Sequence, residues 1–128
     1  MNDSVKVIHD DAFNNCKSLS YVRLSRNLEY IGGEAFYHCY SLPSIFIPPS
    51  CTEIDGYVFR LCEKLIILSV PQHTQLGTKV IGETALIKAS PIFTDTDGDY
   101  DNDEVANYWI KNHHASGNQF SLHCACSS

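Results

Sequence analysis

The sequence predicts an α/β solenoid, in which successive turns of the chain stack as coils around a shared apolar interior. The motif Ala-Phe-x-x-Cys starts at Ala12 and again at Ala35, and a variant with valine in place of alanine starts at Val58. These three starting points, at residues 12, 35 and 58, are 23 residues apart. Apolar positions on both sides of the motif recur with the same period. A fixed period of this length is typical of a repeat array rather than of a domain with one central core.

Apolar residues occupy matching positions in every repeat, which predicts the interior of the coils. The matching sets are Val5, Leu28 and Cys51; Ile8, Ile31 and Ile54; Phe13, Phe36 and Phe59; Leu19, Leu42 and Leu65; Val22, Ile45 and Leu68; and Leu24, Ile47 and Val70. The phenylalanines are expected to form a continuous ladder of stacked rings. Because one coil buries too little apolar surface alone, its stability depends on its neighbours.

Each repeat also contains one segment with the composition of a β-strand, at residues 19–24, 42–47 and 65–70. Side chains alternate along a strand, so every second residue of these segments faces the interior. We expect the three strands to form a parallel concave sheet. Pro48 and Pro71 end two of them, because proline offers no N–H to the ladder.

The opposite, convex side of each coil carries the Ala-Phe-x-x-Cys motif. Aspartate or glycine precedes the motif, which favours the start of a short helical turn. Three of the six cysteines, Cys16, Cys39 and Cys62, fall at the same repeat position, where a small buried apolar side chain is expected. Neighbouring coils would also bring these thiols close enough for a disulfide.

Both ends of the array depart from the pattern. Residues 80–86 resemble the start of a fourth, degenerate coil, displaced by four surplus residues within 73–79. At the other end, Met1 enters part-way through a coil without a polar cap, so apolar surface is expected to be exposed there. This predicts either a fragment of a longer array or end-to-end self-association through the first coil.

The pattern from Ile31 to Pro48, repeated with small changes from Ile54 to Cys62, resembles the BspA-like leucine-rich repeat family over residues 5–93. The resemblance implies a leucine-rich-repeat horseshoe, and a surface or interaction protein without catalytic activity. Residues 105–124 also resemble C-terminal extensions of such repeats in single-celled eukaryotes, although the cysteine spacing near the end departs from theirs.

The chain therefore divides into a solenoid at residues 1–93 and a C-terminal cap at residues 94–128. The cap is expected to contain an acidic loop, a helix from about Asp103 to His114, and a tail. Trp109 and Ile110 fall on one face of this helix and would cover the last coil, or alternatively dock on a partner.

Two patterns in the cap suggest metal sites. Alternating aspartates match the oxygen-ligand spacing of a calcium loop: Asp95, Asp97, Asp99, Asp101 and Asp103. Tyr100 stands where that loop needs glycine and Ala106 where it needs a bidentate glutamate, so a solvated acidic loop is favoured. His113, His114, His123, Cys124 and Cys126 lack the paired spacing of structural zinc sites. No metal or other cofactor is therefore expected.

The remaining features exclude several classes of protein. The formal net charge of −6 argues against nucleic acid and anionic membrane as partners. The sequence has no apolar run long enough to insert in a membrane and no signal peptide, which favours an intracellular protein. It has no nucleophile elbow, phosphate-binding glycine loop or His-Glu-x-x-His motif, so no catalytic residues and no enzyme are expected.

The function favoured by the sequence is therefore a non-catalytic protein–protein interaction module that binds a partner through the concave face. The outward positions of the predicted strands are Tyr21, Arg23, Ser44, Phe46, Ile67 and Ser69. Aromatic residues and arginine dominate the energetics of many interfaces. The alternatives are a structural fragment of a longer repeat protein and, less favoured, a calcium-responsive unit.

Overall fold

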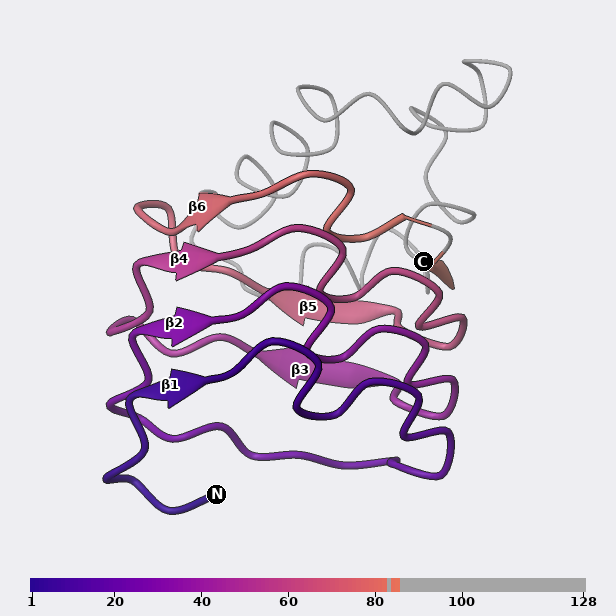
Figure 1. The fold of residues 1–128 in the computed structure, drawn as a ribbon, viewed down its shortest axis with the longest axis horizontal. Helices are drawn as coiled ribbons and strands as arrows, with labels where there is room; N and C mark the ends of the chain where they lie inside the picture. Colours follow the sequence, from indigo (N-terminus) through magenta and orange to yellow (C-terminus); the bar gives the residue numbers. More distant parts are fainter. Residues whose placement is uncertain (83, 86–128) are drawn as a thin grey trace.

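The chain winds into stacked coils in a computed structural model that describes residues 1–82, 84 and 85 (Figure 1). Its strands are β1 (Val7–Ile8), β2 (Tyr30–Ile31), β3 (Ser44–Phe46), β4 (Glu53–Ile54), β5 (Ile67–Ser69) and β6 (Gln75–Leu76). They form two parallel sheets, one in the order β1-β2-β4-β6 and one that pairs β3 with β5. Figure 1 shows the four-stranded sheet in front of β3 and β5. The predicted solenoid with parallel strands is confirmed.

The strand register repeats the period of the sequence. Tyr30 of β2 pairs with Val7 below it and with Glu53 above it, and Ser44 of β3 pairs with Ile67 of β5. In each of these pairs, the two residues are separated by one full period of the sequence. One repeat is therefore one coil, and equivalent residues lie directly above one another.

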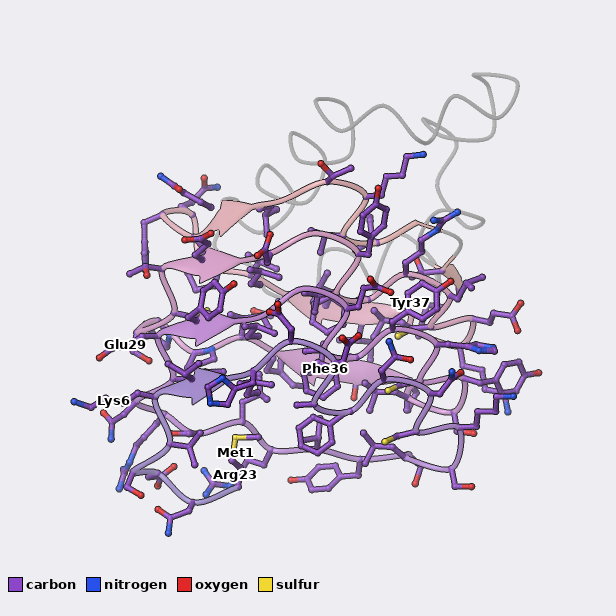
Figure 2. All side chains as sticks on the ribbon, in the orientation of Figure 1. Met1, Lys6, Arg23, Glu29, Phe36 and Tyr37 are labelled. Carbon is purple, nitrogen blue, oxygen red and sulfur yellow. The ribbon has the colours of Figure 1, made fainter. Side chains whose placement is uncertain are left out.

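The predicted phenylalanine ladder is also confirmed. The ring centroids of Phe13 and Phe36 lie 5.1 Å apart, and those of Phe36 and Phe59 lie 5.8 Å apart, with the rings stacked. Phe36 and Phe59 are fully buried, and Figure 2 shows Phe36 among the side chains of the interior. Burying such a ring stabilises the fold by about 1.5–3 kcal/mol.

The four-stranded sheet was not expected from the sequence. Each of its strands has two residues, which is too short for the alternation of apolar and polar residues to be visible. Ile8, Ile31 and Ile54, predicted only as core positions, are the buried residues of β1, β2 and β4. Hydrogen bonding to the next coil makes these pairs into strands, because isolated two-residue segments have no stability of their own.

The predicted strand at residues 19–24 is absent, and the other two are three residues long. Pro43 accounts for part of this difference. In the next coil, the Ile66 N–H donates to the Pro43 carbonyl at 3.0 Å. Pro43 is the equivalent of Ile66 in the preceding coil. It has no N–H, so it cannot donate the corresponding hydrogen bond to the carbonyl of residue 20. The ladder therefore lacks this bond between the first two coils.

The short helical turns predicted for the Ala-Phe-x-x-Cys segments are not confirmed, since residues 1–82 contain no helix. Two residues per coil have a left-handed backbone with positive φ: Asp11 and Asn15; Glu34 and His38; Tyr57 and Leu61; and, once in the described part of the fourth coil, Lys79. A residue with positive φ interrupts a right-handed helix. The freed N–H groups of Asp11, Phe13 and Asn15 donate instead to carbonyls of the next coil at 3.1, 2.7 and 2.8 Å.

The fourth coil does not begin where the sequence analysis placed it. Ile54 pairs with Leu76, and the Phe59 N–H donates to the Val80 carbonyl at 2.9 Å. Val80 and Ile81 therefore take the positions of Val58 and Phe59, one residue earlier than the period of the preceding coils requires. The prediction of surplus residues was wrong: the third coil, from Ile54 to Leu76, is one residue shorter than the coils from Ile8 to Ile31 and from Ile31 to Ile54.

The predicted cap at residues 94–128 lies outside the described residues, together with its aspartate loop, its helix and its histidines and cysteines. The calcium and zinc patterns therefore stay predictions. Within the described part of the chain, no helix is long and apolar enough to cross a membrane.

Candidate protein-binding surface

The surface predicted to bind a partner lies on the outer side of β3 and β5. We call it the β3–β5 face and define it by the six predicted residues Tyr21, Arg23, Ser44, Phe46, Ile67 and Ser69. The register places Ser44 beside Ile67 and Phe46 beside Ser69. Tyr21 and Arg23 occupy the same repeat positions as Ser44 and Phe46, one coil earlier. The six residues thus form two columns, each with one member in each of three successive coils.

The two aromatic residues are the most exposed part of this face. The exposed fraction is 73% for Tyr21 and 45% for Phe46. Ile45, next to Phe46 in β3, is fully buried, as its inward position predicts. Side chains therefore alternate between the two faces of the strand: the aliphatic side chain of Ile45 points into the interior, and the aromatic ring of Phe46 reaches the solvent.

Arg23 is held at the N-terminal end of the stack. Its Nη1 lies 3.4 Å from a carboxylate oxygen of Asp3, and its Nη2 donates to the Met1 carbonyl at 3.1 Å. Figure 2 shows Met1 and Arg23 together at this end. Asp3 also accepts hydrogen bonds from Arg26, whose backbone N–H is the largest cause of the lowered pKa of the Asp3 carboxyl. Arg23 therefore already has an anionic neighbour.

Sequence reasoning missed this cluster, although a signal was present. Asp3 and Arg26 are separated by one period of the sequence and so occupy the same position of successive coils. Opposite charges at one repeat position predict a contact, in the same way as cross-strand pairs in a sheet.

The upper end of the face is less accessible than predicted. Ser69 is only 4% exposed, whereas Ser44 and Ile67 are half-buried. Ser69 lies in β5, within the strand segment predicted at residues 65–70. The alternation of side chains along a strand does not reveal what else covers a side chain. The exposed part of the β3–β5 face is therefore concentrated on Tyr21 and Phe46, with Arg23 at its edge.

A second, acidic depression lies beside the four-stranded sheet, where the chain enters the turns. Its volume is about 390 Å³, and it is lined by Asp10, Asp11, Gly33, Glu34, Asp55, Gly56, Tyr57, Gly77 and Thr78. The Tyr30 hydroxyl donates to Asp55 at 2.9 Å, and this hydrogen bond is the main cause that raises the pKa of Tyr30 to about 12. No group of three or more His, Cys, Asp or Glu in the described residues is arranged to hold a metal ion.

The sequence predicts the aspartates of this depression only as the starts of helical turns. The signal for a shared surface was the recurrence of acidic residues at neighbouring repeat positions, at Asp10, Asp11, Glu34 and Asp55. Stacking the coils brings these positions to one edge. The carboxylate of Asp10 also accepts from the Gly33 N–H at 2.9 Å, so part of this acidity stabilises the junction of two coils.

Comparison with protein families identifies the repeat. The family described as BspA type Leucine rich repeat region (6 copies) matches residues 1–96. The chain belongs to this family. Such leucine-rich repeats generally serve protein interaction or form structural repeat regions, and no catalytic family is indicated.

The solved structures include a leucine-rich repeat protein of T. pallidum that is similar to this chain. The two are 23% identical, with a TM-score of 0.48, and the match covers 62% of this chain and 49% of the other. The matched part thus spans about half of that protein. No curated protein matches the chain.

The cysteines of the leucine-rich repeat are free thiols throughout the described residues. Cys39, Cys51 and Cys62 are fully buried, as predicted, and Cys16 is half-buried. The Cys39 thiol donates to the Phe13 carbonyl at 3.2 Å, and the Cys62 thiol donates to the Phe36 carbonyl at 3.0 Å. The Cys39 and Cys62 thiols therefore each join their coil to the preceding one, whereas the Cys51 thiol donates to the Glu53 carbonyl of its own coil at 3.6 Å.

Burial makes the thiols of Cys51 and Cys62 poor nucleophiles. Burial raises the pKa of Cys51 to about 11. The interaction with the neighbouring Cys39 thiol, together with burial, raises the pKa of Cys62. Since the thiolate is the reactive form, these positions favour a structural role.

Proposed function

We propose that the chain is a non-catalytic protein-interaction module that binds a protein partner through the β3–β5 face. The observation that carries the proposal is the exposure of Tyr21 and Phe46 on one side of the stacked coils. Aromatic side chains that remain this exposed contribute less to the interior than the fully buried residues do, and tyrosine and arginine are enriched among the residues that dominate binding energy.

The backbone beneath Phe46 favours binding. Phe46 lies in β3, whose paired strand β5 and buried residue Ile45 hold it in place. A side chain presented from a paired strand loses less conformational entropy on binding than one on a mobile loop. The ion pair of Arg23 with Asp3 lies at the edge of the β3–β5 face. A suitable partner would place an apolar group on the rings of Tyr21 and Phe46 and a polar group beside this ion pair.

The test is a comparison of three versions of the full chain as bait in a pull-down from its native source. The variant Tyr21→Ala with Phe46→Ala removes both exposed rings. Tyr40→Ala is the matched control, because this tyrosine is 41% exposed but lies beside Lys64 on the turn side of the coils, outside the β3–β5 face. The double variant is expected to lose proteins that the native chain and the control retain in equal amounts.

The affinity for a captured partner then gives the magnitude. Loss of one dominant interface residue costs at least about 2 kcal/mol, which corresponds to roughly thirtyfold in Kd. The thermal midpoint shows that each version is folded; only a small decrease is expected for the double variant, because Tyr21 is 73% exposed and Phe46 is 45% exposed. Equal capture by the double variant would show that the partner binds elsewhere.

A further inference from the structure

Cys39 and Cys62 form a buried pair of thiols between the second and third coils. They occupy the same position in consecutive repeats, and both are fully buried free thiols. The coil below contacts Cys39 at the Phe13 carbonyl, and the coil above accepts the Leu61 N–H at the Gly82 carbonyl, 2.9 Å away. The pair therefore lies inside the stack, with a described coil on each side.

The backbone brings the two cysteines within the range of a disulfide. The residues directly before them, His38 and Leu61, both have positive φ, at 58° and 62°, so the two turns have the same shape at this point. The His38 N–H donates to the Arg60 carbonyl at 2.8 Å, which holds the turns one hydrogen bond apart. Backbones joined in this way lie about 4.8 Å apart, and the Cα atoms of disulfide partners usually lie about 4.4–6.8 Å apart.

The thiols themselves are neighbours. The Cys62 thiol donates to the Phe36 carbonyl at 3.0 Å, so it reaches into the turn that contains Cys39. The interaction with Cys62 is the largest cause of the lowered pKa of Cys39, and the interaction with Cys39 is the largest cause of the raised pKa of Cys62. Cys39 is therefore the member of the pair that loses its proton more readily.

The other described cysteines lack such an arrangement. Cys51 stands between Leu28 and Thr74 at its repeat position, so no thiol is equivalent to it in the adjacent coils. Cys16 lowers the pKa of Cys39 through its backbone and not through its thiol. One pair of neighbouring thiols is thus left in the part of the chain that the structure describes.

We propose that Cys39 and Cys62 are a redox pair that closes to a disulfide by exchange with a small disulfide such as oxidised glutathione. The Cys39 thiolate attacks one sulfur of the small disulfide, whose S–S bond breaks and releases one thiolate. Cys62 then loses its proton and attacks the Cys39 sulfur, which releases the second thiolate. The pair gives up two electrons and two protons, which convert the small disulfide into two thiols.

Local opening of one turn gives access to the pair. Both thiols are buried in the closed fold, but the turn around Cys39 is at the surface, where Tyr40 is 41% exposed and His38 is half-buried. Such openings expose buried groups without unfolding the whole chain. Once Cys39 carries the small thiol, Cys62 attacks within the same molecule, and its proximity compensates for its raised pKa.

The disulfide ties the coil of β3 to the coil of β5. Cys39 precedes β3, and Cys62 precedes β5, each within the same coil. Stacked coils can otherwise separate one by one, and a link across one full repeat also restricts the unfolded chain. The oxidised chain should therefore unfold at a urea concentration higher by about 1 M or more.

The test exposes the full chain to oxidised glutathione under native conditions. Samples are quenched with acid, the remaining thiols are alkylated, and peptide mass spectrometry without reduction identifies the linked cysteines. The expected product is a link between Cys39 and Cys62 that dithiothreitol reverses. Peptides with Cys124 and Cys126 are assigned separately. Urea unfolding then compares the oxidised chain with the reduced chain.

Three variants serve as controls. Cys51→Ala removes a thiol that is equally buried but has no thiol neighbour, so the link should form as in the native chain. Cys16→Ala should also leave the link intact. Cys62→Ala should abolish both the link and the rise of the urea midpoint. If Cys62→Ala does not fold, the oxidised and reduced forms of the native chain still provide the comparison.

A link between Cys39 and Cys62 that raises the urea midpoint supports the proposal. A link between Cys39 and Cys16, or glutathione that stays on Cys39 without any internal link, overturns it. So does a chain in which neither thiol reacts, a link that forms only in urea, or a linked chain with an unchanged midpoint. None of these readouts depends on the β3–β5 face, so they leave the proposed function to its own test.

Discussion

Replacing Phe36 with alanine should destabilise the chain far more than the same replacement at Phe13. Phe36 is fully buried, with one ring on each side at 5.1 and 5.8 Å. Removing a buried phenylalanine costs about 3–5 kcal/mol, which includes the cavity left behind. This is a large part of the roughly 5–15 kcal/mol that stabilises a typical domain.

Phe13 has the same chemistry but a different environment. It is half-buried and stacks on Phe36 alone among the described rings. About half of the transfer free energy of a phenylalanine, roughly 1 kcal/mol, and one ring contact of about 0.5–1.5 kcal/mol would be lost. We therefore expect Phe13→Ala to cost about 2 kcal/mol, roughly half as much as Phe36→Ala.

The measurement is equilibrium urea unfolding of the full chain, followed by far-ultraviolet circular dichroism. Because stacked repeats can open one by one, the slope of the transition must be compared between variants along with the midpoint. Equal losses for Phe13→Ala and Phe36→Ala would refute the reasoning, because the ring of the first coil would then be as well covered as the central one.

Two further predictions concern the junctions between coils. Gly32→Ala should destabilise the chain by about 1–3 kcal/mol in urea unfolding, because its new Cβ would lie 2.5 Å from a backbone nitrogen of the first coil. Gly33→Ala is the control and should be nearly neutral, since its nearest contact would be 3.6 Å; equal losses would contradict this account of the junction. Asp55→Asn should lower the pKa of Tyr30 from about 12 toward its ordinary value near 10, measured by NMR titration of the ring carbon. The hydrogen bond stabilises the neutral phenol, so its contribution to stability is complete below pH 10 and is lost as the pH rises toward 12. Glu53→Gln should lower this pKa less, because Glu53 is the weakest of its causes; a Tyr30 pKa unaffected by Asp55→Asn would argue against the hydrogen bond.

The stacking order of the coils could be predicted from the sequence because the period is written directly in it. Phe13, Phe36 and Phe59 share one repeat position, and any regular stacking at that period places their rings in a ladder. The exposed positions of Tyr21 and Phe46 followed from the alternation of side chains along a strand.

The local conformations could not be predicted with the same success. The Ala-Phe-x-x-Cys segments were expected to be helical, but their N–H groups find acceptors in the next coil, and two residues per coil adopt positive φ. The partner of such a group lies a full repeat away. A reading based on local propensity therefore misses it.

The prediction of where the fourth coil begins was wrong for a related reason. Leu76 and Ile81 differ from the isoleucine and phenylalanine that they replace, and the loss of one residue shifts them out of the period. A better match to the residue types of the earlier coils lies further along the chain, at residues 80–86. The register is instead shown by the backbone hydrogen bond that the Phe59 N–H donates to the Val80 carbonyl. Such bonds depend on the position of a residue and not on the identity of its side chain.

By itself, the sequence determined that this chain is a repeat array, how long each coil is, and which side chains share its interior, because burial recurs at every period. Tertiary structure alone decided which short segments become strands, how the turns bend, and which predicted surface residues stay accessible. Ser69 and Arg23 illustrate the last point: both were placed on the outer face, yet one is covered and the other is paired with Asp3. Exposure and pairing depend on groups that are distant along the chain, and only their arrangement in space brings them together.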